Sequence, residues 1–289
     1  MFRVAGLLSA TLIVLIIVFI TMRGIQVFLP AYRYGQANLI EFLTGMIWRQ
    51  DREIYGVFFI AINTLLVSIG AAIISFPISI LTALFIAKIA PQRIRTLLTT
   101  VIELLAAIPS IVYGVFAAAN VTRMVVTIAG WFNYSTFSGN SMLAVIILLA
   151  IMIFPIMTSV SITAIRSVPE DIQLGSLALG ASRTQTNFKV VLASAKSGMF
   201  AGLILGLGRS FGEATAVTLV AGNKLFGPTF NPLDITRTLT STMLAGLKET
   251  TGLDYDIRFS VGIILMAVII GTNLFVHWVK RKIGSVSNE

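Results

Sequence analysis

The sequence predicts an all-α protein that crosses a membrane about six times. Of its 289 residues, 56% are hydrophobic and only 11% are charged, whereas a soluble domain carries about 25% charged residues. Apolar stretches also recur along the chain at the length of about 20 residues that one helix needs to span a bilayer. These observations exclude the water-soluble fold classes and predict a polytopic membrane protein.

The six stretches belong to a single membrane domain, residues 1–289. The first is longer than the apolar region of a signal peptide, so we expect an uncleaved first span. The second and third are too long for one straight crossing, and we expect them to tilt, to extend beyond the bilayer or to bend at Pro77 and Pro109. The predicted spans are residues 4–29, 57–87, 97–128, 141–165, 198–222 and 259–279.

Polar residues predict where two of these helices begin or end. Asn63 and Thr64 are expected to cap the outer end of the second span, because their side chains can accept hydrogen bonds from free backbone N–H groups. Gly222 and Asn223 are expected to end the fifth helix, since both residue types favour the conformation that follows a helix C-terminus.

The basic residues indicate the direction of the spans. The net charge of +9 is scattered between apolar stretches and forms no single face, so lipid rather than nucleic acid is the expected partner. Four short segments rich in Lys and Arg fall on one side, which predicts cytoplasmic N- and C-termini. They are the region of Arg3, the turn with Lys88, Arg93 and Arg95, the loop 166–197, and the tail Lys280-Arg281-Lys282.

Several kinds of chemistry are excluded. The chain has no cysteine, so disulfides and thiolate chemistry drop out, and the single histidine does not supply the several ligands of a His-based metal site. The sequence contains neither a nucleophile–base constellation nor a GK[ST] phosphate loop. We therefore expect no catalytic residues, no metal and no cofactor in this chain.

Two charged residues, Arg209 and Glu213, fall inside the fifth predicted span. A charged side chain at the bilayer centre costs roughly 2.5–3.5 kcal/mol on insertion scales. In a helix these residues share one narrow sector with three glycines at four-residue spacing, which let a neighbouring backbone approach closely. This face must therefore meet protein or water. The glycines are Gly198, Gly202 and Gly206.

Two interpretations of the charged residues stay open. In the first, Arg209 and Glu213, one helical turn apart, form an ion pair that only locks helices together. In the second, Arg209 lines an anion path, because its planar fork of donors matches a tetrahedral oxyanion. Glu213 would then neutralise Arg209 when the path is empty. Ser110 and Tyr113 flank the bend at Pro109, where their hydroxyls either line the path or repair backbone hydrogen bonds.

The loop 166–197 is much more polar than the flanking spans. Pro169 should start a short helix whose first turn carries Glu170 and Asp171, which suits the helix dipole. Apolar residues on both sides of a turn around Gly180 predict a helix–turn–helix at the membrane surface. Such an element either docks a cytoplasmic partner or forms an interfacial hairpin.

This loop resembles the coupling loop of permease subunits in binding-protein-dependent ABC importers. The family pattern, roughly EAA-x3-G-x9-I-x-LP, is matched by Ser176, Gly180, Val190 and Leu192. Leu174, Gly175 and Ala193 depart from it, which removes the contact that the family's Glu would make. The resemblance implies that the segment around Ala178 and Gly180 docks an ATPase subunit.

Three further segments resemble the phosphate branch of that family, the PstC-type permeases. They are NTLLVS (63–68), IPSIVYG (108–114) and GRSFGEATAVTLVAGN (208–223). The resemblance runs from about residue 55 to the C-terminus, with an importer core over about 55–280. Thr215 stands one position later than the threonine of the branch pattern, so its role in the path is open. Molybdate and sulfate permeases carry a similar Arg…Gly-Glu helix, so that helix alone does not identify the anion.

The resemblance implies a type I ABC importer permease fold in the inner membrane of a prokaryote. The chain would work with a second related permease, two ATPase subunits that bind ATP and Mg, and a soluble phosphate-binding protein. ATP binding would move the coupling helices and open the gate near Arg209 outward, and phosphate would cross by alternating access. The alternatives are a molybdate or sulfate permease, or a structural membrane subunit whose charged pair only locks helices.

Overall fold

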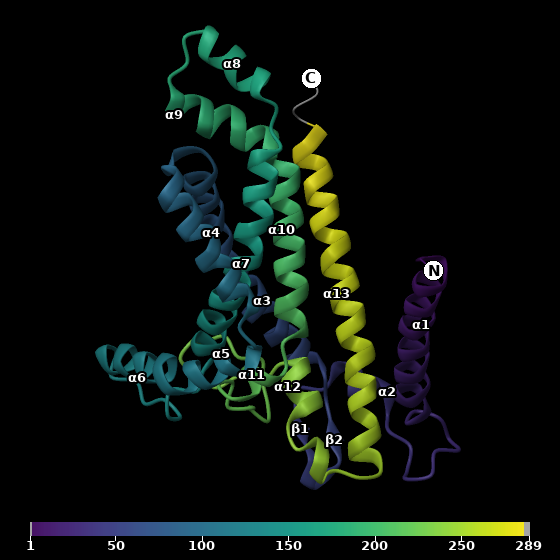
Figure 1. Cartoon of the computed structure of the whole chain (residues 1–289). Helices are drawn as coiled ribbons and strands as arrows, with labels where there is room; N and C mark the ends of the chain where they lie inside the picture. Colours follow the sequence, from purple (N-terminus) through teal and green to yellow (C-terminus); the bar gives the residue numbers. More distant parts are fainter. Residues whose placement is uncertain (1, 286–289) are drawn as a thin grey trace.

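The computed structural model describes residues 2–285, and in it the chain is a bundle of long helices with shorter elements at both ends (Figure 1). Among these residues six helices are long and apolar enough to cross a membrane, which confirms the predicted fold class. Residues 1 and 286–289 of the predicted domain lie outside the described residues. Five of the six helices correspond to α1 (Phe2–Gln26), α3 (Phe58–Leu84), α7 (Met142–Arg166), α10 (Leu192–Gly212) and α13 (Leu253–Ser285), and the sixth is Ser110–Trp131.

The centre of the bundle is formed by α3, α7 and α10, whose apolar side chains make the largest buried cluster. The three glycines of α10 face α7. A Cβ atom at Gly202 would lie 3.3 Å from the carbonyl oxygen of Met157 and from Cβ of Val160, and Gly198 and Gly206 face α7 still more tightly. The prediction that these glycines admit a neighbouring backbone is confirmed at Gly198 and Gly202, whereas Gly206 admits the side chain of Met157.

The N-terminal helix α1 packs on α13 and is otherwise exposed along its apolar length. Close to its end, the Ser260 hydroxyl donates a 2.6 Å hydrogen bond to the carbonyl of Gly24. Beyond α1, buried Asp256 accepts a 2.7 Å hydrogen bond from the Tyr32 hydroxyl and lies 3.5 Å from the Arg23 guanidinium. Burial, reinforced by Asp256, raises the pKa of Tyr32 above its ordinary value. These contacts fasten α1 to one end of α13.

The predicted span 97–128 is two helices with different directions. The first, α4 (Gln92–Ala107), ends where Ile108 becomes extended, because Pro109 has no N–H to donate and its ring blocks a continuing helix. A second helix then runs from Ser110 to Trp131 and lies across the long helices (Figure 1). The bend at Pro109 is confirmed and the single span is wrong. Pro77, in contrast, lies within α3, which continues through a π-helical segment, Phe85–Ile89.

The crosswise helix and the connections contain shorter elements. At one end of the molecule the strands β1 and β2 form a two-residue antiparallel pair, with Trp48 opposite Tyr55. The shorter elements are α2 (Leu39–Thr44), β1 (Trp48–Arg49), β2 (Ile54–Tyr55), α5 (Ser110–Phe116), α6 (Thr122–Trp131), α8 (Glu170–Ala178), α9 (Arg183–Gln185), α11 (Thr215–Thr218) and α12 (Leu239–Leu244).

Asn63 and Thr64 do not cap the second span, because α3 begins at Phe58 and both residues lie buried inside it. The side-chain oxygen of Asn63 accepts a 2.8 Å hydrogen bond from the backbone N–H of Thr229. The Thr64 hydroxyl accepts a 2.9 Å bond from the N–H of Leu239. The polar pair therefore fastens the segment that leads into α12 onto α3.

The predicted helix–turn–helix of the loop 166–197 is present at the opposite end of the molecule, as α8 followed by a turn and α9. Its second helix is not separate. From Arg183 the chain stays helical through a π-helical segment, Thr186–Val191, into α10, so the fifth predicted span begins earlier than residue 198. The capping box of Ser182 and Gln185 starts this long helix. The chain ends of α1 and α13 point toward the end that carries α8 (Figure 1).

Candidate functional site

The candidate site lies where α10 stops. The helix ends at Gly212, and Glu213 has an extended backbone with φ −77° and ψ 111° before α11 begins. The prediction of one helix through residue 222 is therefore wrong. Gly222 and Asn223 occupy a later turn, where both have positive φ angles. The break leaves Arg209 in the last turn of α10 and moves Glu213 off its helical face.

Glu213 is 8% exposed, and its backbone and side chain are both engaged. The carboxylate oxygen Oε1 accepts a 3.0 Å hydrogen bond from the N–H of Ala216. The backbone carbonyl accepts a 2.8 Å bond from the hydroxyl of Thr240 on α12. Glu213 thus holds the first turn of α11 and links it to α12.

Arg209 is partly buried, and its Nε atom is buried without a hydrogen-bond partner among residues 2–285. No carboxylate in that range lies within the 4.0 Å of an ion pair with it. The expected pair with Glu213 is therefore absent. The i,i+4 geometry requires a continuous helix, and the carboxylate instead faces the N–H of Ala216.

Tyr113 brings α5 to the same end of α10, because it belongs to the buried cluster that includes Leu207 and Phe211. Its hydroxyl donates a 2.8 Å hydrogen bond to the carbonyl of Leu105. That carbonyl lies four residues before Pro109, which has no N–H to offer it. The geometry thus favours the repair interpretation for Tyr113.

Close packing of α5 on α11 assembles this region. A Cβ atom at Gly114 would lie 2.8 Å from Cα of Ala216, so only glycine admits this approach. Ser110 is partly buried at the start of α5, and Thr215 is exposed at the start of α11. Of the predicted pathway residues, Tyr113 lies on the helix that packs against α11, and Glu213 accepts a hydrogen bond from the first turn of α11.

Two residues near the site were not predicted from the sequence. Ser210 follows Arg209, is 3% exposed, and has a buried hydroxyl without a partner among the described residues. Its position beside Arg209 was the signal that could have identified it. Thr240 lies far along the chain from Glu213, and no sequence pattern indicates their contact.

The arrangement suits the binding of an anion. A guanidinium interacts strongly with an oxyanion when it lies in a site of low dielectric constant and has an N–H group without an acceptor. Within residues 2–285, no three His, Cys, Asp or Glu side chains lie close enough to hold a metal ion.

The second predicted site, the loop around Gly180, lies at the α8 end. Gly180 has φ +85°, a conformation that L side chains rarely adopt. The hydroxyls of Ser176 and Thr186 lie 3.0 Å apart and tie α8 to the helix that follows. Lys88 donates a 2.8 Å hydrogen bond to the side chain of Gln173, which links α8 to the end of α3.

The predicted loop residues differ in exposure. Val190 and Leu192 are partly buried beneath α8, whereas Ala178 is exposed. Apolar side chains of α8 and its turn also face outward, and Leu179 is 91% exposed. The exposed apolar residues of this surface are Ile172, Leu174, Leu177 and Leu179.

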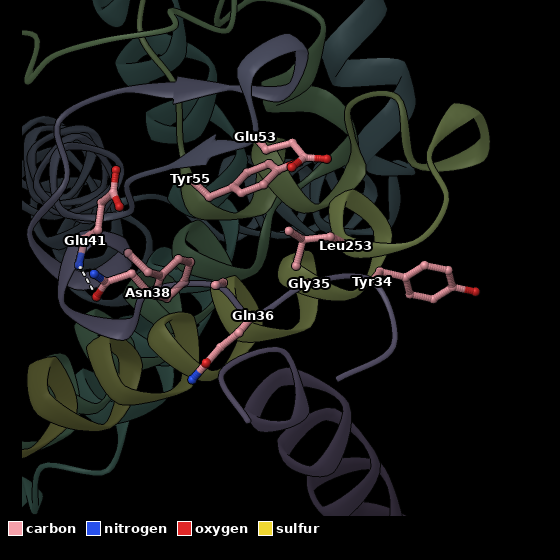
Figure 2. A pocket seen from close by; sticks show the side chains of 10 residues that line it. Tyr34, Gly35, Gln36, Asn38, Glu41, Glu53, Tyr55 and Leu253 are labelled. Atoms are coloured by element: carbon pink, nitrogen blue, oxygen red, sulfur yellow. Dashed lines mark hydrogen bonds between the residues drawn. The ribbon is translucent and has the colours of Figure 1, made fainter. Parts of the chain in front are cut away.

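A polar cleft of about 230 Å³ opens at the other end of the molecule. Figure 2 shows Glu41 from α2, Glu53 and Tyr55 from the β1–β2 hairpin, and Leu253 from the start of α13 around it. Burial, reinforced by Asp254 and Glu53, raises the pKa of Tyr55 above its ordinary value, so the phenol stays neutral. The sequence analysis did not identify this cleft, because its walls come from distant segments.

Comparisons with known sequences agree with the predicted resemblance. Residues 75–285 match the family described as binding-protein-dependent transport system inner membrane component. The chain is similar to the probable ABC transporter permease protein YqgH of Bacillus subtilis, with 36% identity over 259 residues, which cover 88% of this chain and 81% of that protein. It is also similar to the phosphate transport system permease protein PstC of Pasteurella multocida, with 32% identity over 244 residues, which cover 79% and 75% of the two chains.

The fold is similar to that of solved transporters. A chain of a bacterial ABC transporter involved in the import of the acidic polysaccharide alginate aligns with a TM-score of 0.62, at 20% identity, over 96% of both chains. The inward-facing MetNI methionine ABC transporter aligns with a TM-score of 0.55, at 17% identity, over 79% of this chain and 94% of that one.

Proposed function

The chain belongs to the family of binding-protein-dependent transport system inner membrane components, and we propose that it carries inorganic phosphate. Membership of this family makes it a multi-pass inner-membrane permease subunit of an ABC importer, with the type I permease fold. The segments IPSIVYG and GRSFGEATAVTLVAGN, together with the 32% identity to a phosphate permease, support phosphate as the substrate.

The proposal rests above all on Arg209. A permanently charged guanidinium lies at the end of a membrane helix, and its Nε has no partner among the described residues. Keeping a charge in such a place is costly unless an anion or water meets it. Hydrogen phosphate offers several oxygens to the guanidinium fork, which matches two of them at once. Glu213 contributes by holding α11, and Ser110, Tyr113 and Thr215 belong to the walls of the proposed path.

The proposed cycle needs other subunits. A soluble phosphate-binding protein would deliver phosphate at the end that carries β1 and β2. Two ATPase subunits would hold ATP and Mg, and one of them would dock at the exposed apolar surface of α8 around Ala178 and Gly180. A second, related permease subunit would complete the path. Both chain termini would then lie in the cytoplasm, on the α8 side.

Phosphate uptake in cells that lack this chain and every other phosphate importer tests the proposal. Wild-type chain should restore uptake of labelled phosphate, and excess sulfate or molybdate should not compete. Arg209→Ala should abolish uptake while the complex still assembles, and Arg93→Ala, which removes an exposed arginine at the start of α4, should leave uptake near the wild-type rate. Uptake that sulfate or molybdate inhibits would assign another oxyanion. Full uptake by Arg209→Ala would make that residue structural.

A further inference from the structure

The far end of the crosswise helix carries a group of exposed aromatic side chains. We call this group the aromatic tip. Their exposed fractions are large for residues of this size, and Trp131, at 75%, is more exposed than Trp48 or Trp278. The aromatic tip consists of Trp131 (75% exposed), Phe132 (71%), Tyr134 (38%) and Phe137 (68%).

The position of the aromatic tip is that of a membrane boundary. Ser110–Trp131 has the length and hydropathy of a span, yet α6 runs across the long helices, near the level of α11 and α12 (Figure 1). The chain enters α7 at Met142, soon after the tip, and Ser141 caps that helix by accepting a 3.1 Å hydrogen bond from the N–H of Ala144. The tip therefore lies beside the point where a membrane-spanning helix begins.

The crosswise helix also has two chemically different faces near the tip. Val121, Val125 and Ala129 are buried against the bundle, whereas the exposed face mixes the polar Arg123 and Thr127 with the apolar Met124 and Val126. An exposed arginine of this kind can reach the phosphates of lipid headgroups while its stem covers apolar surface. This arrangement is typical of a helix that lies in the plane of the interface.

The sequence of the aromatic tip matches the same environment. Aromatic residues are interspersed with polar ones in WFNYSTFS, residues 131–138. Trp and Tyr concentrate at the headgroup level of membranes, because they combine an apolar ring with a polar group. A purely apolar patch would instead suit the hydrocarbon core or a dry protein interface. The mixed composition favours lipid headgroups over a protein partner.

We propose that the aromatic tip binds the lipid headgroup layer on the side of the membrane opposite α8, so that Ser110–Trp131 lies along the interface instead of crossing the bilayer. The tip then supports α5 from outside the bundle, because α5, the π-helical segment Ala117–Val121 and α6 form one continuous helix. This inference requires a membrane protein but does not depend on the transported substrate.

Spin labels at single introduced cysteines test this, because the chain has none of its own. Labels at Phe132→Cys and Phe137→Cys measure the environment of the aromatic tip. Ile151→Cys, exposed midway along α7, reports the hydrocarbon core, and Leu179→Cys, 91% exposed, reports water. The full chain is labelled with a nitroxide, reconstituted in phosphatidylcholine–phosphatidylglycerol vesicles, and probed with oxygen and with a water-soluble nickel chelate.

We expect the tip labels to give oxygen-to-nickel accessibility ratios between those of the two reference positions. Ratios equal to that of Leu179→Cys would place the tip in water and overturn the proposal. Ratios equal to that of Ile151→Cys would place the tip in the hydrocarbon core and overturn the proposal as well. Low accessibility to both reagents would show that protein, here a second copy of the chain, covers the tip, and would also overturn the proposal.

Discussion

Replacement of Gly114 by alanine tests the contact that assembles the site. The new Cβ atom would lie 2.8 Å from Cα of Ala216, whereas ordinary contact begins at 3.4 Å. The neighbour is backbone rather than a flexible side chain, so α11 must retreat by about half an ångström. Overpacking of this kind costs about 1–3 kcal/mol. Alanine also gains about 0.5–1 kcal/mol over glycine inside a helix, so we expect a net loss of about 1–2 kcal/mol.

The assay is the thermal unfolding of the purified full chain in detergent, combined with uptake measured per assembled complex. Gly130→Ala is the matched control, because no atom lies within 4 Å of the added Cβ. We expect Gly114→Ala to melt below the wild type and the control to melt at or above it. Uptake should also fall in Gly114→Ala, since the displaced residue, Ala216, donates the hydrogen bond to Glu213. A Gly114→Ala chain that melts and transports like the control would refute the close contact.

Three other substitutions give distinct outcomes. Tyr113→Phe should lower the free energy of unfolding by about 0.5–1.5 kcal/mol, because the carbonyl of Leu105 keeps only its 3.3 Å hydrogen bond from the N–H of Ile108; unchanged melting would mean that the tyrosine bond contributes nothing. Asp256→Asn should lower stability by about 1.5–3 kcal/mol and speed proteolysis of the loop after α1, because Tyr32 loses a charged acceptor; equal cleavage rates would show that other contacts hold the loop. Gly180→Ala should cost about 1–2 kcal/mol through its positive φ alone, as no atom lies within 4 Å. Gly180→Trp should then melt like Gly180→Ala, and any further loss of ATPase copurification would report a partner surface at the turn.

Apolar length and proline were reliable guides to the fold. The number of span-length helices, the bend at Pro109 and the helix–turn–helix around Gly180 follow from local features, because each depends on residues close in the sequence. Capping by Asn63 and Thr64 was the clearest error among the helix ends. Both residue types favour helix starts, but here they lie inside α3 and accept hydrogen bonds from Thr229 and Leu239. Tertiary contacts thus overrode a local preference.

The candidate site, too, was predicted only in part from the sequence. Arg209 was identified from the sequence alone, because a charge in an apolar stretch is costly wherever the helix packs. Its pairing with Glu213 was inferred from an unbroken helix, and the structure breaks the helix between them.

The sequence by itself determined the membrane environment, the family pattern and the position of one arginine inside an apolar span, since composition and spacing carry these directly. The tertiary structure decided the direction of each helix and the partner of each polar group. Gly114 meets Ala216, Thr240 reaches the carbonyl of Glu213, and Ser110–Trp131 turns across the bundle. These outcomes depend on segments that are distant in the chain, so no local pattern can specify them.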